Sequence, residues 1–145
     1  MASPVDPLNL ERFVEAQAKD YAAALAELRA GRKTTHWIWY VLPQLRGLGT
    51  SSRAIHYGIG SLDEARAYLA HPVLGPRLLE CVAAMNALRA ATAVQVLGPI
   101  DAAKFRSCLT LFLAADPKNG VLREALDKYY GGVPDERTLA LLGAA

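Results

Sequence analysis

The sequence predicts an all-α fold, arranged as a single compact domain of seven or eight helices. Apolar residues recur at three- and four-residue steps along most of the chain, and helix-capping residues precede these segments. No segment alternates apolar and polar residues as a half-buried strand would. The 145 residues (1–145) match the length of one domain, and 52% hydrophobic with 21% charged residues is typical of globular proteins.

The first predicted helix begins at Asp6-Pro7, where Asp6 can cap the helix and proline loses only an N–H that would be unpaired. Gly31 marks its end. Residues 35–42 then predict a short buried helical turn, because Pro43 rules out a longer helix.

The next helices follow a glycine-rich turn. Thr50 or Ser51 can cap a short helix, and Ser61 with Glu64 matches the capping-box pattern of a helix that ends near residue 71. Helical spacing continues from Val73 to about residue 91.

The C-terminal third predicts three more helices after an apolar turn at 94–97. Asp101 is expected to cap a helix that continues to Asp116. Another helix stops at Gly131, and a last short one starts at Asp135.

Charge is distributed unevenly along the chain. The net charge is only +2, yet residues 28–62 contain five basic residues and no acid. A local positive field of this kind favours a phosphate or another anion, whereas binding of duplex nucleic acid mainly by charge requires a larger basic surplus. We therefore expect an anionic small-molecule partner and no duplex nucleic acid.

Within this basic stretch lie a glycine turn and both tryptophans. The turn at 47–52, Gly-Leu-Gly-Thr-Ser-Ser, resembles a phosphate-binding loop before a helix, but it is also consistent with an ordinary turn and a hydroxyl cap. Trp37, Trp39 and Tyr40 are either core residues or a stacking surface for a flat ring.

Four polar residues recur at three-residue steps in the predicted helix 101–112: Asp101, Lys104, Ser107 and Thr110. They form one stripe beside an apolar face. They are either a cap followed by hydroxyls bonded to the preceding turn, or the wall of a pocket. Because buried polar groups need partners, we expect the 36–53 segment and this helix to meet and share one concavity.

The sequence contains no pattern that predicts a disulfide, a metal site or a membrane span. Cys81 and Cys108 lie in helical segments without a signal peptide, which predicts reduced thiols in a cytoplasmic protein. The histidines lack metal-ligand spacing, so neither a metal nor a cofactor is expected. No apolar run is long enough to span a membrane.

Three blocks in this order resemble a bacterial family of small all-α domains of unknown function whose members often carry a calpastatin-like label. The blocks are Lys33-x-x-His36-Trp37-Ile38-Trp39-Tyr40-Val41-Leu42-Pro43-Gln44-Leu45-x-Gly47-Leu48-Gly49-x-Ser51, Tyr68-Leu69-x-His71-Pro72-Val73-Leu74-Gly75-x-Arg77-Leu78 and Asp101-x-x-Lys104-x-x-Ser107-x-x-Thr110-Leu111-Phe112. More distantly, the Lys104-Phe105 pair and the helical order are similar to NADAR (YbiA-like) domains. That resemblance implies activity on N-glycosidic bonds of ADP-ribose-like nucleotides. The Trp-x-Ser-x-Glu-x-x-Tyr-Gln pattern of those domains is absent here.

These observations lead to two hypotheses. The first is a domain that binds an anionic nucleotide-like or ADP-ribose-like molecule, with N-glycosidase-type hydrolysis as the activity that the remote resemblance implies. The second is a non-catalytic interaction module with a basic docking surface. The predicted ligand-binding residues are His36, Trp37, Trp39, Gln44, Arg46, Gly47, Gly49, Ser51, Arg53, Lys104, Ser107 and Thr110. Glycosidic chemistry also needs a carboxylate, for which Asp101 and Asp135 are the candidates.

Overall fold

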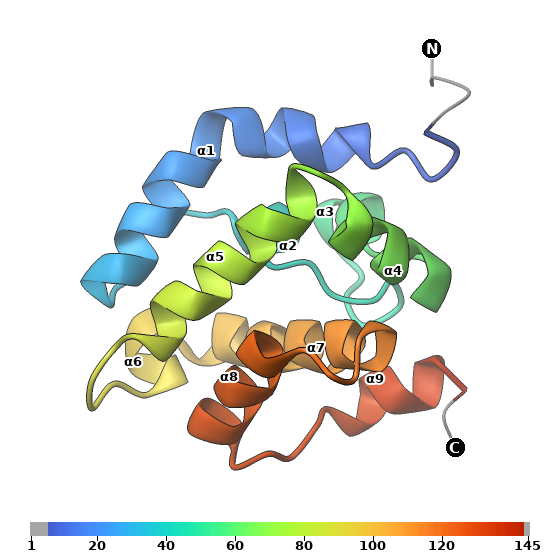
Figure 1. Ribbon diagram of the computed structural model, residues 1–145. Coiled ribbons are helices and arrows are strands. Elements are labelled where there is room, and N and C mark those ends of the chain that lie inside the picture. The colour runs from blue at the N-terminus through green and yellow to red at the C-terminus, as the bar shows by residue number, and fades with distance from the viewer. Residues whose placement is uncertain (1–5, 144–145) are drawn as a thin grey trace.

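A computed structural model describes residues 6–143 (Figure 1). The fold is all-α, as the sequence predicts. The helices of this range are α1 (Glu11–Ala30), α2 (Ile38–Val41), α3 (Ser52–Tyr57), α4 (Leu62–Ala70), α5 (Leu74–Asn86), α6 (Ala93–Leu97), α7 (Pro99–Ala115), α8 (Gly120–Tyr130) and α9 (Glu136–Leu141). The helix beyond the expected number is α6, where the sequence predicts only an apolar turn.

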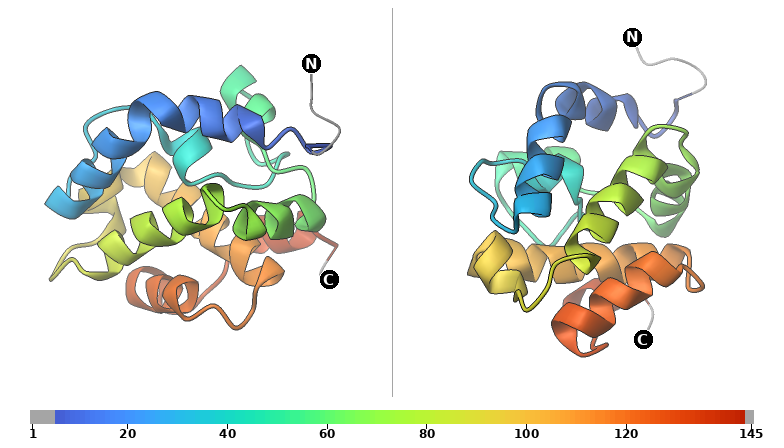
Figure 2. Two further views of the ribbon diagram at one scale, coloured as in Figure 1. Left: turned by 45° about the horizontal axis from the view of Figure 1, so that its top comes forward. Right: turned by 60° about the vertical axis from the view of Figure 1, so that its left-hand side comes forward.

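Two long helices, α5 and α7, form the centre of the fold. α5 contacts α1, α4 and α8, and α7 contacts α4, α6, α8 and α9. In Figures 1 and 2, α1 lies at one end of this arrangement and α8 with α9 at the other. The largest fully buried side chains come from different parts of the chain and include Phe13, Trp37, Tyr68, Phe105 and Phe112.

Two predicted helix starts need correction. α1 begins at Glu11, not at Asp6, although the Asp6 carboxylate accepts hydrogen bonds from the backbone N–H groups of Leu10 and Glu11 at 2.7 and 3.0 Å. α7 begins at Pro99, so Asp101 lies in its first turn and does not cap it. Proline at the first position costs no hydrogen bond, which allows the earlier start.

The capping box predicted at the start of α4 forms only in part. Ser61 accepts a hydrogen bond from the Glu64 N–H at 3.1 Å, but the Glu64 carboxylate accepts from the Gly60 N–H instead of from Ser61. The reciprocal pair forms at α6, between Thr92 and Gln95. The second carboxylate oxygen of Glu64 has a charged partner.

That partner is Arg12, in a buried ion pair between α1 and α4. Arg12 Nη2 lies 2.7 Å from Glu64 Oε2, and the two side chains are 7% and 6% exposed. The remaining guanidinium donors bind the backbone carbonyls of Leu8, Asn9, His56 and Gly58. This ion pair fixes the N-terminus of α1 against the segment that joins α3 to α4.

Both cysteines are free and buried. Burial raises the pKa of Cys81 to about 12 and also raises that of Cys108. Since the thiolate is the reactive form, neither side chain is a nucleophile near pH 7.

Residues 6–143 contain neither a membrane-spanning helix nor a cluster of metal-ligating side chains. None of the helices within 6–143 has the length and apolar character needed to cross a membrane. Over the same range, no group of three or more His, Cys, Asp or Glu side chains is placed to hold a metal ion.

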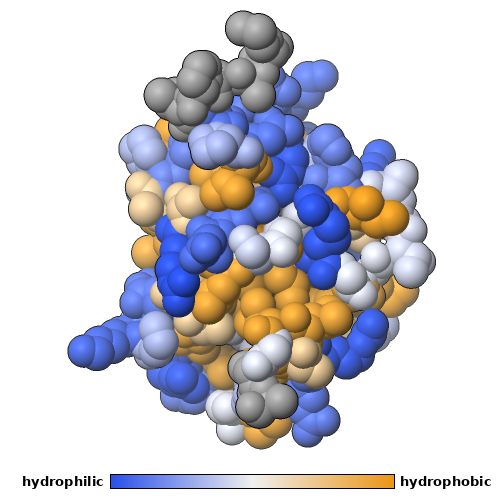
Figure 3. Space-filling model, turned by 90° about the vertical axis from the view of Figure 1, so that its right-hand side faces the viewer, coloured by the Kyte–Doolittle hydropathy of each residue, from blue (hydrophilic) through white to orange (hydrophobic). Residues whose placement is uncertain are grey.

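The surface also presents apolar side chains. On the face that Figure 3 shows, hydrophobic residues gather in the middle. The large apolar residues of the whole described surface that are at least about a third exposed are Leu8, Ile55, Val94, Ile100, Val133 and Leu141.

Candidate functional site

The segment 36–53 and helix α7 meet at Trp39, as the sequence analysis expects. The Lys104 ammonium of α7 lies 5.0 Å from the centroid of the Trp39 ring, and the Arg53 guanidinium of α3 lies 4.9 Å from it. Each distance is within the range of a cation–π contact. We refer to Trp39, Arg53 and Lys104 as the Trp39 cluster.

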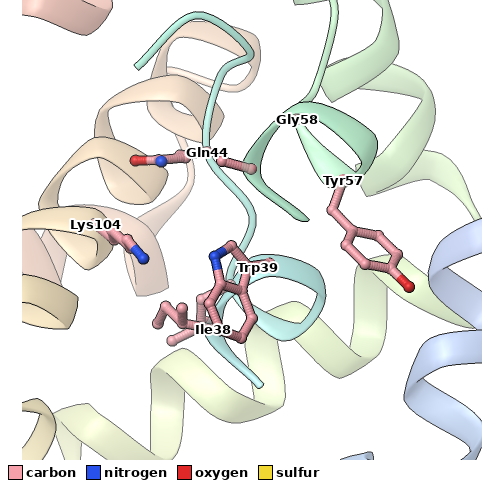
Figure 4. A pocket seen from close by; sticks show the side chains of 8 residues that line it. Ile38, Trp39, Gln44, Tyr57, Gly58 and Lys104 are labelled. Atoms are coloured by element: carbon pink, nitrogen blue, oxygen red, sulfur yellow. The ribbon is translucent and has the colours of Figure 1, made fainter. Parts of the chain in front are cut away.

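A small cavity adjoins this cluster. Its walls include Trp39, Gln44, Tyr57 and Lys104, together with backbone at Gly58. Figure 4 shows the Gln44 amide directed toward α7 and the Tyr57 ring directed toward α1. The space open to a water-sized sphere is about 10 Å³, which is room for about one water molecule. The cavity itself is therefore too small for a nucleobase.

The cations of this region outnumber the acids that pair with them. Asp101 Oδ2 lies 2.8 Å from Lys33 Nζ, and Asp101 Oδ1 lies 3.8 Å from Lys104 Nζ. Arg53 forms no ion pair with any residue of 6–143. Lys33 and Lys104 thus share one carboxylate, and Arg53 adds a further cation at the ring of Trp39.

An open groove continues from the Trp39 cluster toward α1. Arg53 and Tyr57 line it, and its volume is about 500 Å³, which is within the usual range for small-molecule sites. The other side chains of this polar groove are Arg12, Glu15, Ala16, Lys19, Asp20, His36, Tyr40 and His56. Arg53 therefore belongs both to the cluster and to a groove large enough for a ligand.

Three aromatic side chains, those of Tyr40, His56 and Tyr57, line the groove. The rings of Tyr40 and Tyr57 are 5.1 Å apart at their centroids, and the His56 ring packs edge-on against Tyr57 at 4.6 Å. Tyr40 donates a hydrogen bond to Asp20. Burial, and then this carboxylate, raise the pKa of Tyr40, so the phenol stays protonated at neutral pH.

Trp37 does not reach this site. It is 1% exposed, and its indole Nε1 donates a hydrogen bond to Glu27 at 3.0 Å. Its predicted role in stacking a ligand is wrong, because the ring is core.

Glu27 is a residue that the sequence analysis missed. Its carboxylate also accepts hydrogen bonds from the Thr34 N–H, the Thr35 N–H and the Thr35 hydroxyl. Burial alone would raise the pKa of Glu27, but the donors at Thr35, Thr34 and Trp37 outweigh it and lower the pKa to about 2. Glu27 therefore holds the segment that leads to Trp39. One feature of the sequence could have pointed to Glu27: it is the last acidic residue before the acid-free stretch 28–62.

This pKa predicts an acid-sensitive contribution to stability. Because the pKa in the folded state is depressed from 4.5 to about 2, the contribution is fully present above pH 4.5 and is lost as the pH falls toward 2. Glu27→Gln should lower the free energy of unfolding by about 1–3 kcal/mol at pH 7 and flatten the decline below pH 4.5. Urea unfolding at several pH values measures both effects. Glu124→Gln, at an exposed position of α8, is the control, and an unchanged pH profile for Glu27→Gln would contradict the assignment.

The glycine turn is packed against the protein itself. A methyl group at Gly47 would lie 3.4 Å from Leu141 of α9, and one at Gly49 would lie 2.7 Å from Ala54. Ser51 caps α3 by accepting from the Ala54 N–H at 3.1 Å. Arg46 donates to the carbonyls of Ile55 and Gly58 at 3.0 and 2.9 Å.

The interpretation as a turn with a hydroxyl cap therefore accounts for every one of these contacts. The glycines fit a close approach of chain segments, and the Arg46 guanidinium satisfies carbonyls at the end of α3. A phosphate-binding role for this turn gains no support from the geometry.

The hydroxyl groups of Ser107 and Thr110 in α7 also form hydrogen bonds within the protein. Ser107 donates to the Ala103 carbonyl at 3.2 Å, and Thr110 donates to the Arg106 carbonyl at 2.8 Å while accepting from the Asp135 N–H at 2.8 Å. Neither Ser107 nor Thr110 lines the cavity or the polar groove. The prediction that both share the Trp39 site is wrong, since the bonds to the preceding turn take their hydrogens.

The two candidate catalytic carboxylates, Asp101 and Asp135, also bind groups of the protein itself. Asp101 is bound to Lys33, whose side chain is only 6% exposed. Asp135 caps α9, accepting from the Thr138 N–H and hydroxyl at 3.0 and 2.6 Å. The carboxylates that do line the polar groove are Glu15 and Asp20 of α1.

The fold and the site together define a small all-α domain with a cationic aromatic cluster beside a polar groove. Residues 7–142 match the family described as "Protein of unknown function (DUF1810)", and the chain belongs to that family. No curated protein matches the chain.

A solved structure is similar over almost the whole chain. It is the crystal structure of the conserved hypothetical protein Rv1873 from Mycobacterium tuberculosis, with 51% identity and a TM-score of 0.94, and the match covers 97% of this chain and 100% of that one. Neither comparison refers to calpastatin-type or NADAR-type proteins.

Proposed function

We propose that this protein binds an anionic nucleotide-like molecule, of which ADP-ribose is the model, in the polar groove with its phosphates at the Trp39 cluster. The observation that carries the proposal is the positive excess at Trp39. Arg53 has no carboxylate partner within residues 6–143, and Lys104 shares Asp101 with Lys33 at the longer of two distances. A bound phosphate would supply the missing negative charge.

The groove suits the uncharged part of such a ligand. Glu15 and Asp20 can accept hydrogen bonds from ribose hydroxyls, as acidic residues do in dinucleotide sites. Tyr40, Tyr57 and His56 offer ring surface for a base. Trp39 is assigned to hold the two cations in place.

Hydrolysis of an N-glycosidic bond is the activity to test for this site. Such chemistry needs a carboxylate near an oxocarbenium-like centre. In this groove Glu15 and Asp20 are the proposed candidates for that role, in place of the predicted Asp101 and Asp135. This assignment rests on the lining of the groove and on the remote NADAR resemblance.

Thermal unfolding in the presence of a ligand panel tests the proposal. The panel is ADP-ribose, ADP, AMP, ribose 5-phosphate and inorganic phosphate. At a concentration one hundred times Kd, a ligand should raise Tm by about 5–10 °C. Arg53→Gln and Lys104→Gln should each weaken binding by about 10- to 100-fold, since each removes one charged hydrogen bond.

Matched controls separate this effect from a general loss of charge. Arg89→Gln and Lys118→Gln remove the same charges at exposed positions away from the groove, and both should leave the shift unchanged. If no compound of the panel raises Tm, or if Arg53→Gln and Lys104→Gln respond like the parent protein, the proposal is wrong. Capture of an acidic protein that is lost on Arg53→Glu, without any ligand shift, would instead favour the docking-surface alternative.

A further inference from the structure

A second cleft lies between α7, α8 and α9. Its volume is about 200 Å³. Its lining is mostly apolar and consists of Thr110, Leu113, Ala114, Arg123, Leu126, Pro134 and Leu139. None of these residues lines the cavity or the polar groove, so this apolar cleft is an independent feature.

The single charged side chain of the cleft is unpaired. Arg123 forms neither an ion pair nor a side-chain hydrogen bond with any residue between 6 and 143. No Asp or Glu lines the cleft. Asp135, which follows Pro134, has its carboxylate bound to Thr138.

The other polar side chain of the cleft, Thr110, has no hydrogen left to donate to a ligand. The Thr110 hydroxyl donates to the Arg106 carbonyl and accepts from the Asp135 N–H. A ligand would therefore find one free cation at one point and apolar walls elsewhere. That combination selects for a molecule with one anionic group and an apolar body.

We infer that the apolar cleft binds a small aliphatic monocarboxylate, with the carboxylate on Arg123 and the chain against Leu113, Leu126 and Leu139. A guanidinium pairs with a carboxylate through two parallel hydrogen bonds, which fits one acid group. The cleft is smaller than most sites for drug-sized ligands, so the chain must be short. This inference does not depend on the proposed function at Trp39.

A chain-length series tests this inference. Butyrate, hexanoate, octanoate and decanoate are titrated into ¹⁵N-labelled protein, with 1-octanol as the uncharged analogue. Affinity should rise about fourfold per added methylene until the cleft is filled, and shifts should centre on Ala114 and Leu139. Arg123→Gln should weaken octanoate binding by about tenfold or more and leave 1-octanol unchanged.

Two further variants fix the location. Ala114→Leu fills the cleft and should abolish binding of octanoate and 1-octanol alike. Arg53→Gln removes a cation of the Trp39 cluster and should change neither titration. Absence of binding by every member of the series overturns the inference. It is also overturned by shifts centred on the Trp39 cluster, or by octanoate binding that Arg123→Gln does not weaken.

Discussion

Replacing Arg12 by methionine is expected to lower the free energy of unfolding by about 3–5 kcal/mol. The substitution leaves the Glu64 carboxylate buried, at 6% exposure, without its cation. It also removes donors from the backbone carbonyls of Leu8, Asn9, His56 and Gly58. Urea unfolding followed by circular dichroism measures the loss.

A double variant distinguishes the ion pair from simple packing. Arg12→Met with Glu64→Met removes both charges, so it should cost less than the sum of the two single variants. The exposed pair of Arg66 and Asp63 is the control, and Arg66→Met should cost less than about 1 kcal/mol. Additive effects of the two buried changes would contradict the assigned role.

Gly75→Ala is expected to be the other severe change, at about 3 kcal/mol or more. A methyl group there would lie 2.1 Å from the Leu69 carbonyl oxygen and 2.9 Å from its carbon. These are backbone atoms at the end of α4, so they cannot move aside as a side chain can. Helices α4 and α5 would have to separate, and thermal unfolding should show a large drop in Tm.

Gly120→Ala is the matched control, because nothing lies within 4 Å of the added methyl group at the first residue of α8. Alanine loses less backbone entropy than glycine when the chain folds, so this variant should be neutral or slightly stabilising. If Gly75→Ala behaved like Gly120→Ala, the close contact between α4 and α5 would be wrong.

The fold was largely predictable because helical spacing and capping residues are local signals. Ser51 and Asp135 cap α3 and α9 as the sequence predicts. α6 was missed because its five residues are too few for spacing to register, although Thr92 and Gln95 form a full capping box. The start of α1 was misplaced because Asp6 binds the first amides of that helix from outside it.

The site was predictable only in part. The meeting of Trp39 with Lys104 follows from polar groups set among apolar neighbours on two segments. The polar groove could not be predicted, because Asp20 of α1 comes beside Tyr40 only through tertiary packing. The ion pair of Arg12 and Glu64 could not be predicted either, because the two residues lie 52 residues apart in the sequence. The roles of Ser107 and Thr110 could not be predicted either, because spacing alone does not reveal hydrogen bonds to the preceding turn.

Tryptophan fluorescence during titration with ADP-ribose tests the proposed function most directly. Trp37 is 1% exposed, so a ligand at the groove should perturb the emission of Trp39 alone. A saturable change is expected in the parent protein and in Arg89→Gln, with no change in Trp39→Phe. An unchanged spectrum at saturating ADP-ribose, or an equal change in Trp39→Phe, would contradict a ligand site at the Trp39 cluster.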